Sequence, residues 1–135
     1  MLFIILSLVL NYSCSSKKDN FMVSYYEVKE NLVLMDEEIK GINYKKSSYK
    51  LIVEELTLND IQELNSIIQD TRFHHKNSDL GTCDISGLFK FNDKLVYSVC
   101  GTAQIIISTE KTRETILLTE EGNRKFNELI KSIKN

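Results

Sequence analysis

Two stretches of the chain place apolar residues at helical spacing. The first is Thr57–Asp70, where Thr57 and Asp60 form a plausible capping box. The second is Thr119–Ile133, which begins at a second N-cap threonine. Their apolar stripes consist of Ile61, Leu64, Ile67 and Ile68 in the first, and of Phe126, Leu129, Ile130 and Ile133 in the second. The pattern predicts two amphipathic helices that each bury one face.

Shorter stretches that alternate or are rich in β-branched residues predict strands. These stretches are Phe21–Val28, Asn31–Met35, Tyr49–Glu54, Ile85–Phe91, Lys94–Cys100, Ala103–Ser108 and Arg113–Leu118. Gly41–Ser48 is predicted to be a polar connection. We therefore expect residues 21–135 to form a single α+β domain, in which a mainly antiparallel sheet of about six to seven strands packs one face against both helices. The other face is expected to meet solvent or a partner.

Composition narrows the functional classes. The 135 residues suit one domain, and a net charge of -2 provides no global positive field, so we expect no nucleic-acid partner. There is no Gly-rich phosphate loop, Gly-x-Ser-x-Gly elbow or His-Glu-x-x-His motif, so we predict no cofactor and no catalytic residue. The acidic clusters at 36–38, 54–55 and 120–121 are interpreted as solvated charge, since a hydrolase needs two carboxylates about 5–9 Å apart in a cleft.

The N-terminal segment combines a short apolar stretch with a cysteine. Met1–Leu10 is apolar except for Ser7, and polar residues 15–20 follow Cys14. The stretch is too short to span a bilayer and has the length of a signal-peptide core. The alternative interpretation is that Met1–Leu10 is a buried first strand or helix and that Cys14 is an ordinary thiol.

This segment resembles the start of bacterial lipoprotein precursors. The resemblance lies in Leu10, Ser13 and Cys14. The resemblance implies that residues 1–13 are a lipoprotein signal peptide, and that residues 14–20 are a lipidated cysteine followed by a polar tether. Cys14 would then carry diacylglycerol and a further acyl chain such as palmitate. Two or three such chains hold a domain stably on a membrane. We therefore expect localisation on the bacterial cell envelope, with the domain outside the cytoplasm.

Cys83 and Cys100 remain once Cys14 is assigned to lipid, and disulfides persist outside the cytoplasm. They flank a predicted hairpin whose turn includes Asn92 and Asp93. A two-residue loop would leave the cysteines diagonal, whereas a four-residue loop over 90–93 would set them directly opposite on the same face. We expect the four-residue loop, and a disulfide that stabilises the fold by about 3 kcal/mol.

A redox pair and a metal site are the two other uses that these cysteines could have. A redox pair usually has Cys-x-x-Cys spacing at a helix start, which is missing. A metal site could combine His74 and His75 with Asp79, Cys83 or Asp84, but adjacent histidine side chains diverge on a strand. Both histidines lie in residues 72–82, which we predict to be a surface loop. A structural disulfide is therefore the favoured interpretation.

Residues 49–133 run from a strand through a helix and a Cys-bearing hairpin to a closing helix. This part is similar to small bacterial lipoproteins for which no activity is known, and the similarity lies in Cys83, Asp84, Ile85 and Cys100. The resemblance therefore implies no activity.

The chain also has tyrosines on predicted strands, where they form either cross-strand packing or a binding surface. These are Tyr25, Tyr26, Tyr44, Tyr49 and Tyr97.

The prediction that follows is a membrane-anchored lipoprotein that acts as a non-catalytic binding or inhibitory module on a protein partner. Two alternatives are a small envelope hydrolase or metal-dependent enzyme built around His74 and His75, and an envelope structural protein. An open sheet face or an exposed edge strand would favour the binding module, whereas charged groups that converge in a cleft would favour the enzyme.

Overall fold

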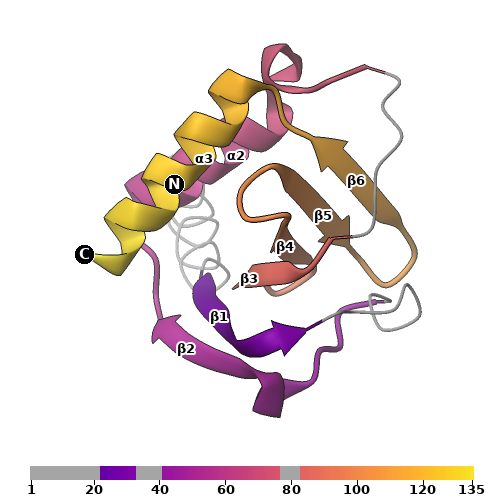
Figure 1. The fold of residues 1–135 in the computed structure, drawn as a ribbon. Helices are drawn as coiled ribbons and strands as arrows, with labels where there is room; N and C mark the ends of the chain where they lie inside the picture. Colours follow the sequence, from indigo (N-terminus) through magenta and orange to yellow (C-terminus); the bar gives the residue numbers. More distant parts are fainter. Residues whose placement is uncertain (1–21, 33–40, 77–82) are drawn as a thin grey trace, which may run out of the picture.

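The computed structural model describes residues 22–32, 41–76 and 83–135, and it has an α+β architecture (Figure 1). The sheet contains six strands, all paired antiparallel, in the order β2-β1-β3-β4-β5-β6. The predicted fold class is thus confirmed, with six strands. The elements are β1 Ser24–Leu32, β2 Tyr49–Val53, α2 Leu58–Gln69, β3 Ile85–Lys90, β4 Leu95–Val99, β5 Gln104–Ser108, β6 Arg113–Leu117 and α3 Glu120–Lys134, with 3-10 turns at Lys46–Ser48 and Thr71–Phe73.

Both helices begin at the predicted threonines. Thr57 Oγ1 accepts a hydrogen bond from the Asp60 backbone N–H at 3.2 Å, and Thr119 Oγ1 accepts one from the Gly122 N–H at 3.2 Å. Each hydroxyl satisfies a backbone donor that has no partner within its own helix. The acidic first turn and basic last turn of α3 also complement its dipole, so both helix starts follow from local sequence.

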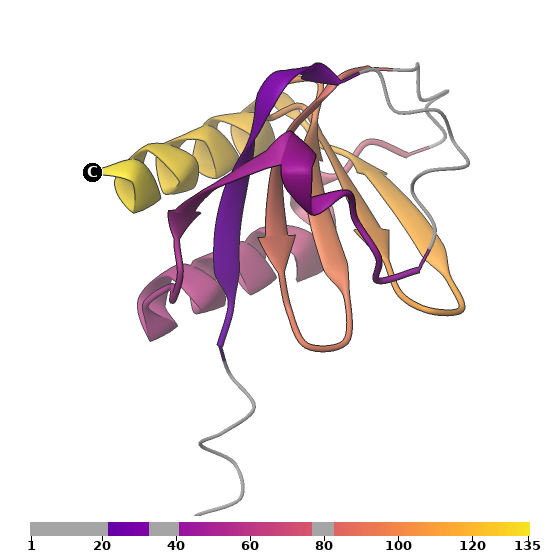
Figure 2. The ribbon, with the colours of Figure 1, turned by 90° about the horizontal axis from the view of Figure 1, so that it is seen from below.

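The helices α2 and α3 lie side by side against one face of the sheet (Figures 1 and 2). Strand side chains from that face and the apolar stripes of both helices form the main core. Burial of this apolar surface is the principal source of stability. The fully buried members with the least exposure are Leu64, Phe89, Val96, Ile105 and Phe126.

The opposite face of the sheet carries a second apolar cluster. Its buried members are Tyr49, Ile85, Leu88, Leu95, Tyr97, Val99 and Ile106, with Tyr26, Val28, Tyr44 and Cys100 packed against them. The expectation that this face meets solvent or a partner is therefore wrong over much of its area. The strands β3, β4 and β5 are buried on both faces, so they contain nearly continuous apolar sequences rather than alternating ones.

The N-terminal part of the sheet differs from the prediction in its strand count. A single strand, β1, covers most of Phe21–Val28 and also reaches residues 31 and 32 of the second predicted strand. Residues 33–35 lie outside the described part of the chain. The single strand β1 thus contains residues of two predicted strands. It pairs with β2 on one side and with β3 on the other, so it is an inner strand of the sheet.

The β3–β4 hairpin has the shorter of the two loops considered. The Phe91 N–H donates to the Lys94 carbonyl at 3.0 Å, so Asn92 and Asp93 form a two-residue turn and the expected loop over 90–93 is wrong. A bulge then inserts Ser86 into β3, because Ile85 pairs with Val99 while Gly87 pairs with Ser98. The prediction assumed an unbroken ladder, and this bulge corrects the register near the cysteines.

The disulfide between Cys83 and Cys100 is present, with the two Cα atoms 5.0 Å apart. The Cys100 N–H donates to the Asp84 carbonyl at 3.1 Å, and Cys100 itself has a left-handed φ of 54°. Beyond it, the Gly101 carbonyl accepts hydrogen bonds from the hydroxyls of Ser86 and Ser98. The cysteines therefore meet through a bulge and a tight turn rather than through direct opposition.

The predicted surface loop over residues 72–82 is partly built into the fold. Phe73 is buried, and its carbonyl accepts the Thr119 N–H at 2.7 Å. The His75 N–H donates to the Leu117 carbonyl at 2.8 Å, so this segment covers the end of the outer edge of β6.

Among the described helices, none is both long and apolar enough to cross a bilayer. Cys14 lies outside the described residues.

Candidate protein-binding surface

The strand β2 forms one edge of the sheet, and it pairs only with β1 among the residues that the structure describes. In this ladder Tyr26 lies opposite Leu51 and Val28 lies opposite Tyr49. Leu51 is 46% exposed although it occupies the middle of the strand. An exposed leucine on a sheet edge with one open side is a potential pairing site for another chain.

The strand β2 has one side that no other strand covers among the described residues. The Tyr49 N–H donates to the Lys46 carbonyl, which precedes it in the chain. Backbone groups alternate in direction along a regular strand, but the β1–β2 ladder shifts register directly after Leu51, since Tyr26 pairs with Leu51 and Tyr25 pairs with Val53. The edge thus offers an exposed apolar side chain beside a strand backbone that can pair with another chain.

Four of the five strand and loop tyrosines gather on the face next to this edge. The Tyr26 and Tyr44 ring centroids lie 5.7 Å apart, and those of Tyr44 and Tyr49 also lie 5.7 Å apart. Tyr97 is buried beneath them in the same cluster. Tyr25 instead packs on the helix side, with its ring centroid 4.7 Å from that of Phe89. Tyr26 and Tyr44 are half-buried, so they extend the apolar surface beyond Leu51.

Tyr44 belongs to residues 41–48, the segment predicted to be only a polar connection. Burial and a hydrogen bond with Tyr26 raise the pKa of Tyr44 to about 12, and burial raises the pKa of Tyr97 above its usual value. Both hydroxyls therefore stay protonated at neutral pH, and the Tyr44 hydroxyl takes part in a hydrogen bond rather than acting as a base. Ser108 Oγ donates to the Gly41 carbonyl at 2.7 Å, which holds the start of this segment against the sheet.

The two ends of the β2 edge carry opposite charge. Lys45, Lys46 and Lys50 are exposed at its beginning, and Glu54 and Glu55 are exposed just past its end. Lysines on an edge strand discourage pairing with neutral or basic chains. They also favour a partner strand with acidic residues at the matching end. We call Tyr26, Tyr44 and β2 with these flanking charges the β2 surface.

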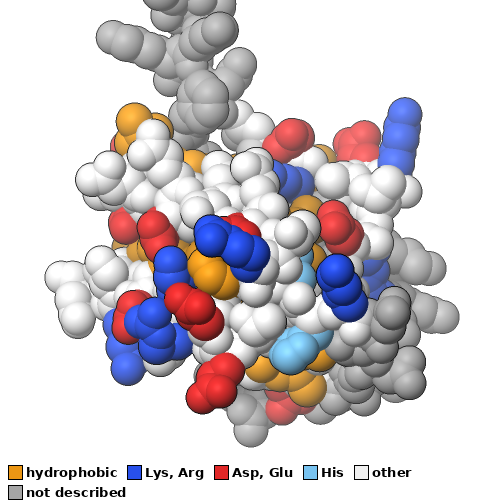
Figure 3. Space-filling model, turned by 90° about the horizontal axis from the view of Figure 1, so that it is seen from above, with side chains coloured by type: hydrophobic (Ala, Val, Ile, Leu, Met, Phe, Trp, Pro, Cys, Tyr) orange, Lys and Arg blue, Asp and Glu red, His pale blue; other side chains and the backbone are white. Residues whose placement is uncertain are grey.

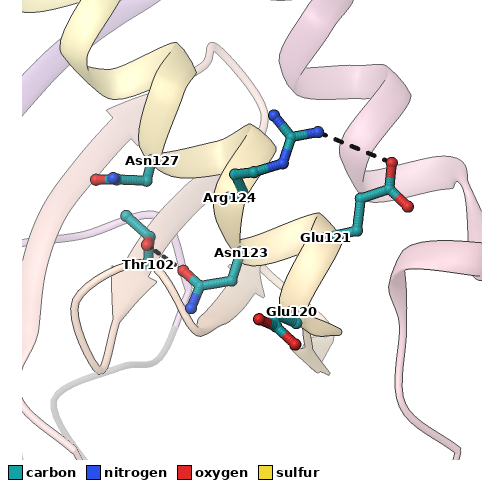
Figure 4. A pocket seen from close by; sticks show the side chains of 6 residues that line it. All are labelled: Thr102, Glu120, Glu121, Asn123, Arg124 and Asn127. Atoms are coloured by element: carbon teal, nitrogen blue, oxygen red, sulfur yellow. Dashed lines mark hydrogen bonds and ion pairs between the residues drawn. The ribbon is translucent and has the colours of Figure 1, made fainter.

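A polar hollow lies beside α3, lined by Thr102, Glu120, Glu121, Asn123, Arg124 and Asn127 (Figure 4). The Thr102 hydroxyl donates to the Asn123 side-chain oxygen, and Arg124 forms ion pairs with Glu121 and Glu128. The side chains of Glu120 and Glu121 point in different directions in Figure 4. The arrangement does not converge on a reacting atom, so it does not resemble a carboxylate pair of a hydrolase.

The histidines considered for metal binding are used differently. The His74 Nε2 atom lies 3.1 Å from the Ile67 carbonyl, and His75 is exposed. Cys83 is occupied by its disulfide, and Asp79 lies outside the described residues. In the described part of the chain, no group of three or more histidine, cysteine, aspartate or glutamate side chains could hold a metal ion.

Charged side chains of both signs are interleaved over the face seen in Figure 3. Such a face provides no single-sign field for a polyanion.

Comparison with known proteins gives no further guidance, since no protein-family model, no curated protein and no solved structure matches the chain. The β2 surface, an exposed edge strand that sequence alone could not place, is the strongest candidate for function.

Proposed function

We propose that this protein is a non-catalytic binding module that is held on a bacterial membrane by lipid on Cys14, with its domain outside the cytoplasm. Its partner is a protein that adds an extended segment to the β2 edge. The observation that carries the proposal is the open side of β2, where Leu51 is 46% exposed next to half-buried tyrosines. An inhibitory role is the same interaction when the captured segment belongs to an enzyme.

Strand addition suits the chemistry of the β2 surface. Main-chain hydrogen bonds to an open edge supply affinity for any extended peptide, and neighbouring side chains select its sequence. Leu51 and Tyr26 would contact an apolar residue of the partner, because tyrosine and apolar side chains dominate the centres of interfaces. The lysines at the beginning of β2 would pair with acidic residues at the matching end of that segment.

The lipid anchor is supported by the arrangement of the first 20 residues. A short apolar stretch ends close to Cys14, and a polar segment separates that cysteine from the folded domain. A disulfide in the domain suits an oxidising compartment outside the cytoplasm. Two or three acyl chains provide stable attachment, since each buried methylene contributes about 0.8 kcal/mol.

Photo-crosslinking tests the binding proposal. A photoreactive amino acid is placed at Leu51 and, as a matched control, at Leu58, which is an exposed leucine outside the β2 surface. Cells that produce the full chain are then irradiated. We expect a discrete protein adduct from position 51 that is absent from position 58 and is lost when Lys45, Lys46 and Lys50 are changed to Glu. No adduct at position 51, or equal adducts at both positions, would refute the proposal.

Changing Cys14 to Ser tests the anchor separately. The Cys14→Ser chain should appear in the soluble extracellular or periplasmic fraction, whereas the wild type should sediment with membranes and carry acyl chains by intact-mass analysis. A variant that still sediments with membranes would show that Cys14 is not the attachment point.

A further inference from the structure

Two of the three large hydrophobic side chains that are exposed among the described residues lie within two residues of one backbone contact between the start of β1 and the start of α2. These two are Met22, 48% exposed, and Leu58, 64% exposed, and the third is Leu51. Met22 directly precedes Val23, whose carbonyl accepts the Leu56 N–H at 2.8 Å. Leu58 follows Leu56 by two residues. This backbone contact therefore brings the start of β1 and the start of α2 to one end of the domain.

A hollow of about 430 Å³ lies at the same end, between the start of β1, the first turns of α2 and the β3–β4 turn. Its apolar lining comes from Met22, Val23, Ile61 and Phe91. The Lys94 Nζ atom lies 4.6 Å from the centre of the Phe91 ring, at the polar rim. The surface thus combines protruding apolar side chains with an amine placed beside them, as in proteins that rest on a headgroup layer.

The chain length limits how far this end can be from the anchor. Eight residue steps separate Cys14 from Met22, and eight extended residues span at most about 29 Å. A lipid on Cys14 therefore keeps Met22 within that distance of the headgroups. Exposed apolar groups that are confined so close to a bilayer are more stable at its interface than in water.

We propose that the end of the domain formed by Met22, Leu58 and the Phe91–Lys94 turn docks directly onto the lipid surface. This inference rests on the lipid anchor of the proposed function. It adds a fixed orientation, in which the domain rests on the bilayer instead of moving freely on its tether. The surface is a lipid-docking surface because its apolar side chains protrude beside the tether, whereas Leu51 lies on the β2 edge.

The charges around this surface indicate which lipids it fits. Glu54 and Glu55 are exposed near Leu56, and Asp93 is exposed in the turn beside Lys94. These carboxylates offset the Lys94 amine, so the described residues of this end do not attract anionic headgroups electrostatically. The contact is therefore apolar and zwitterionic lipids are sufficient for it, in contrast to the polybasic surfaces that depend on anionic lipid.

Tryptophan scanning tests this docking, because the natural chain contains no tryptophan. Met22→Trp, Leu58→Trp and Leu51→Trp variants of the lipidated full chain are each reconstituted into phosphatidylcholine vesicles. Vesicles with bromine in the acyl chains then serve as the quencher. We expect tryptophan at positions 22 and 58 to emit at shorter wavelength and to be quenched, and tryptophan at position 51 to remain unquenched. Adding phosphatidylglycerol should not increase the quenching.

The outcomes separate this inference from the proposed function. If the lipidated chain does not float with the vesicles, the anchor itself is refuted and the docking with it. If the chain floats but positions 22 and 58 are no more quenched than position 51, the anchor stands and the docking is refuted. A photo-crosslinked protein adduct from position 58 together with unquenched tryptophan would also refute lipid docking, since it would make this end a protein-binding surface.

Discussion

Gly122 in the first turn of α3 provides a quantitative test of how the helix layer is packed. A Cβ atom at this position would lie 2.8 Å from the Phe73 Cβ and 2.8 Å from the Phe73 carbonyl oxygen. That carbonyl is fixed, because it accepts the N–H of the N-cap residue Thr119 at 2.7 Å. The Gly122→Ala change would therefore push α3 away from the backbone that positions its own start.

Two opposing effects set the size of this perturbation. Alanine is favoured over glycine inside a helix by about 1 kcal/mol, which would stabilise the variant. Inserting a methyl group into a closely packed site costs about 1–3 kcal/mol, and the cost is near the upper end here because the obstacle is backbone. We expect a net loss of about 1–2 kcal/mol in the free energy of unfolding.

Urea denaturation followed by far-ultraviolet circular dichroism measures this difference in the free energy of unfolding. The comparison holds when the variant and the wild type have the same slope of unfolding free energy against urea concentration. Ser132→Ala is the matched control, because Ser132 lies exposed on the same helix and gains propensity without a clash. The control should equal or slightly exceed the wild type in stability. If Gly122→Ala were as stable as the wild type or more stable, the close contact between α3 and Phe73 would be refuted.

Three further predictions concern the disulfide and the ionisable groups. Cys83→Ser should lower the free energy of unfolding by about 3 kcal/mol in oxidising buffer, and calorimetry in reductant should find it equal to the wild type. The folded pKa values of Tyr44 and Tyr97 lie above those of the unfolded chain, so the stabilisation from these two groups is fully present below pH 10 and should fall as the pH rises toward 12. Circular dichroism at alkaline pH that shows no loss of folded protein would contradict this. The Arg72 guanidinium lowers the pKa of Asp70 to about 2, so the stabilisation is complete above the unfolded pKa and is lost as the pH falls toward 2. Carbon-detected NMR should find that Arg72→Ala returns this pKa toward its ordinary value.

The sequence determined the elements whose causes are local. The threonine caps at Thr57 and Thr119 and the apolar stripes that follow them predicted both helices, because helix starts and helix faces depend on residues three or four positions apart. The alternation of turns and β-branched stretches predicted the antiparallel α+β class. The cysteine pair was also predictable, because two cysteines flank one hairpin.

The candidate site was less predictable. The sequence suggested that tyrosines and an exposed edge strand would mark a binding module, but it could not say which strand would be the edge. It also assigned Gly41–Ser48 to a polar connection, whereas Tyr44 of that segment packs between Tyr26 and Tyr49. These contacts join residues far apart in the chain, and no local pattern encodes them.

Tertiary structure alone decided the features that depend on strand register and on the order of strands in the sheet. The extra residue Ser86 shifts β3 against β4, and Cys100 enters a left-handed turn, so the disulfide forms around a two-residue loop although direct opposition of the cysteines had favoured a four-residue one. Pairing of β1 with both β2 and β3 leaves Leu51 on an open edge. Local periodicity specifies which residues are apolar, whereas long-range hydrogen bonding and packing specify which of them remain exposed.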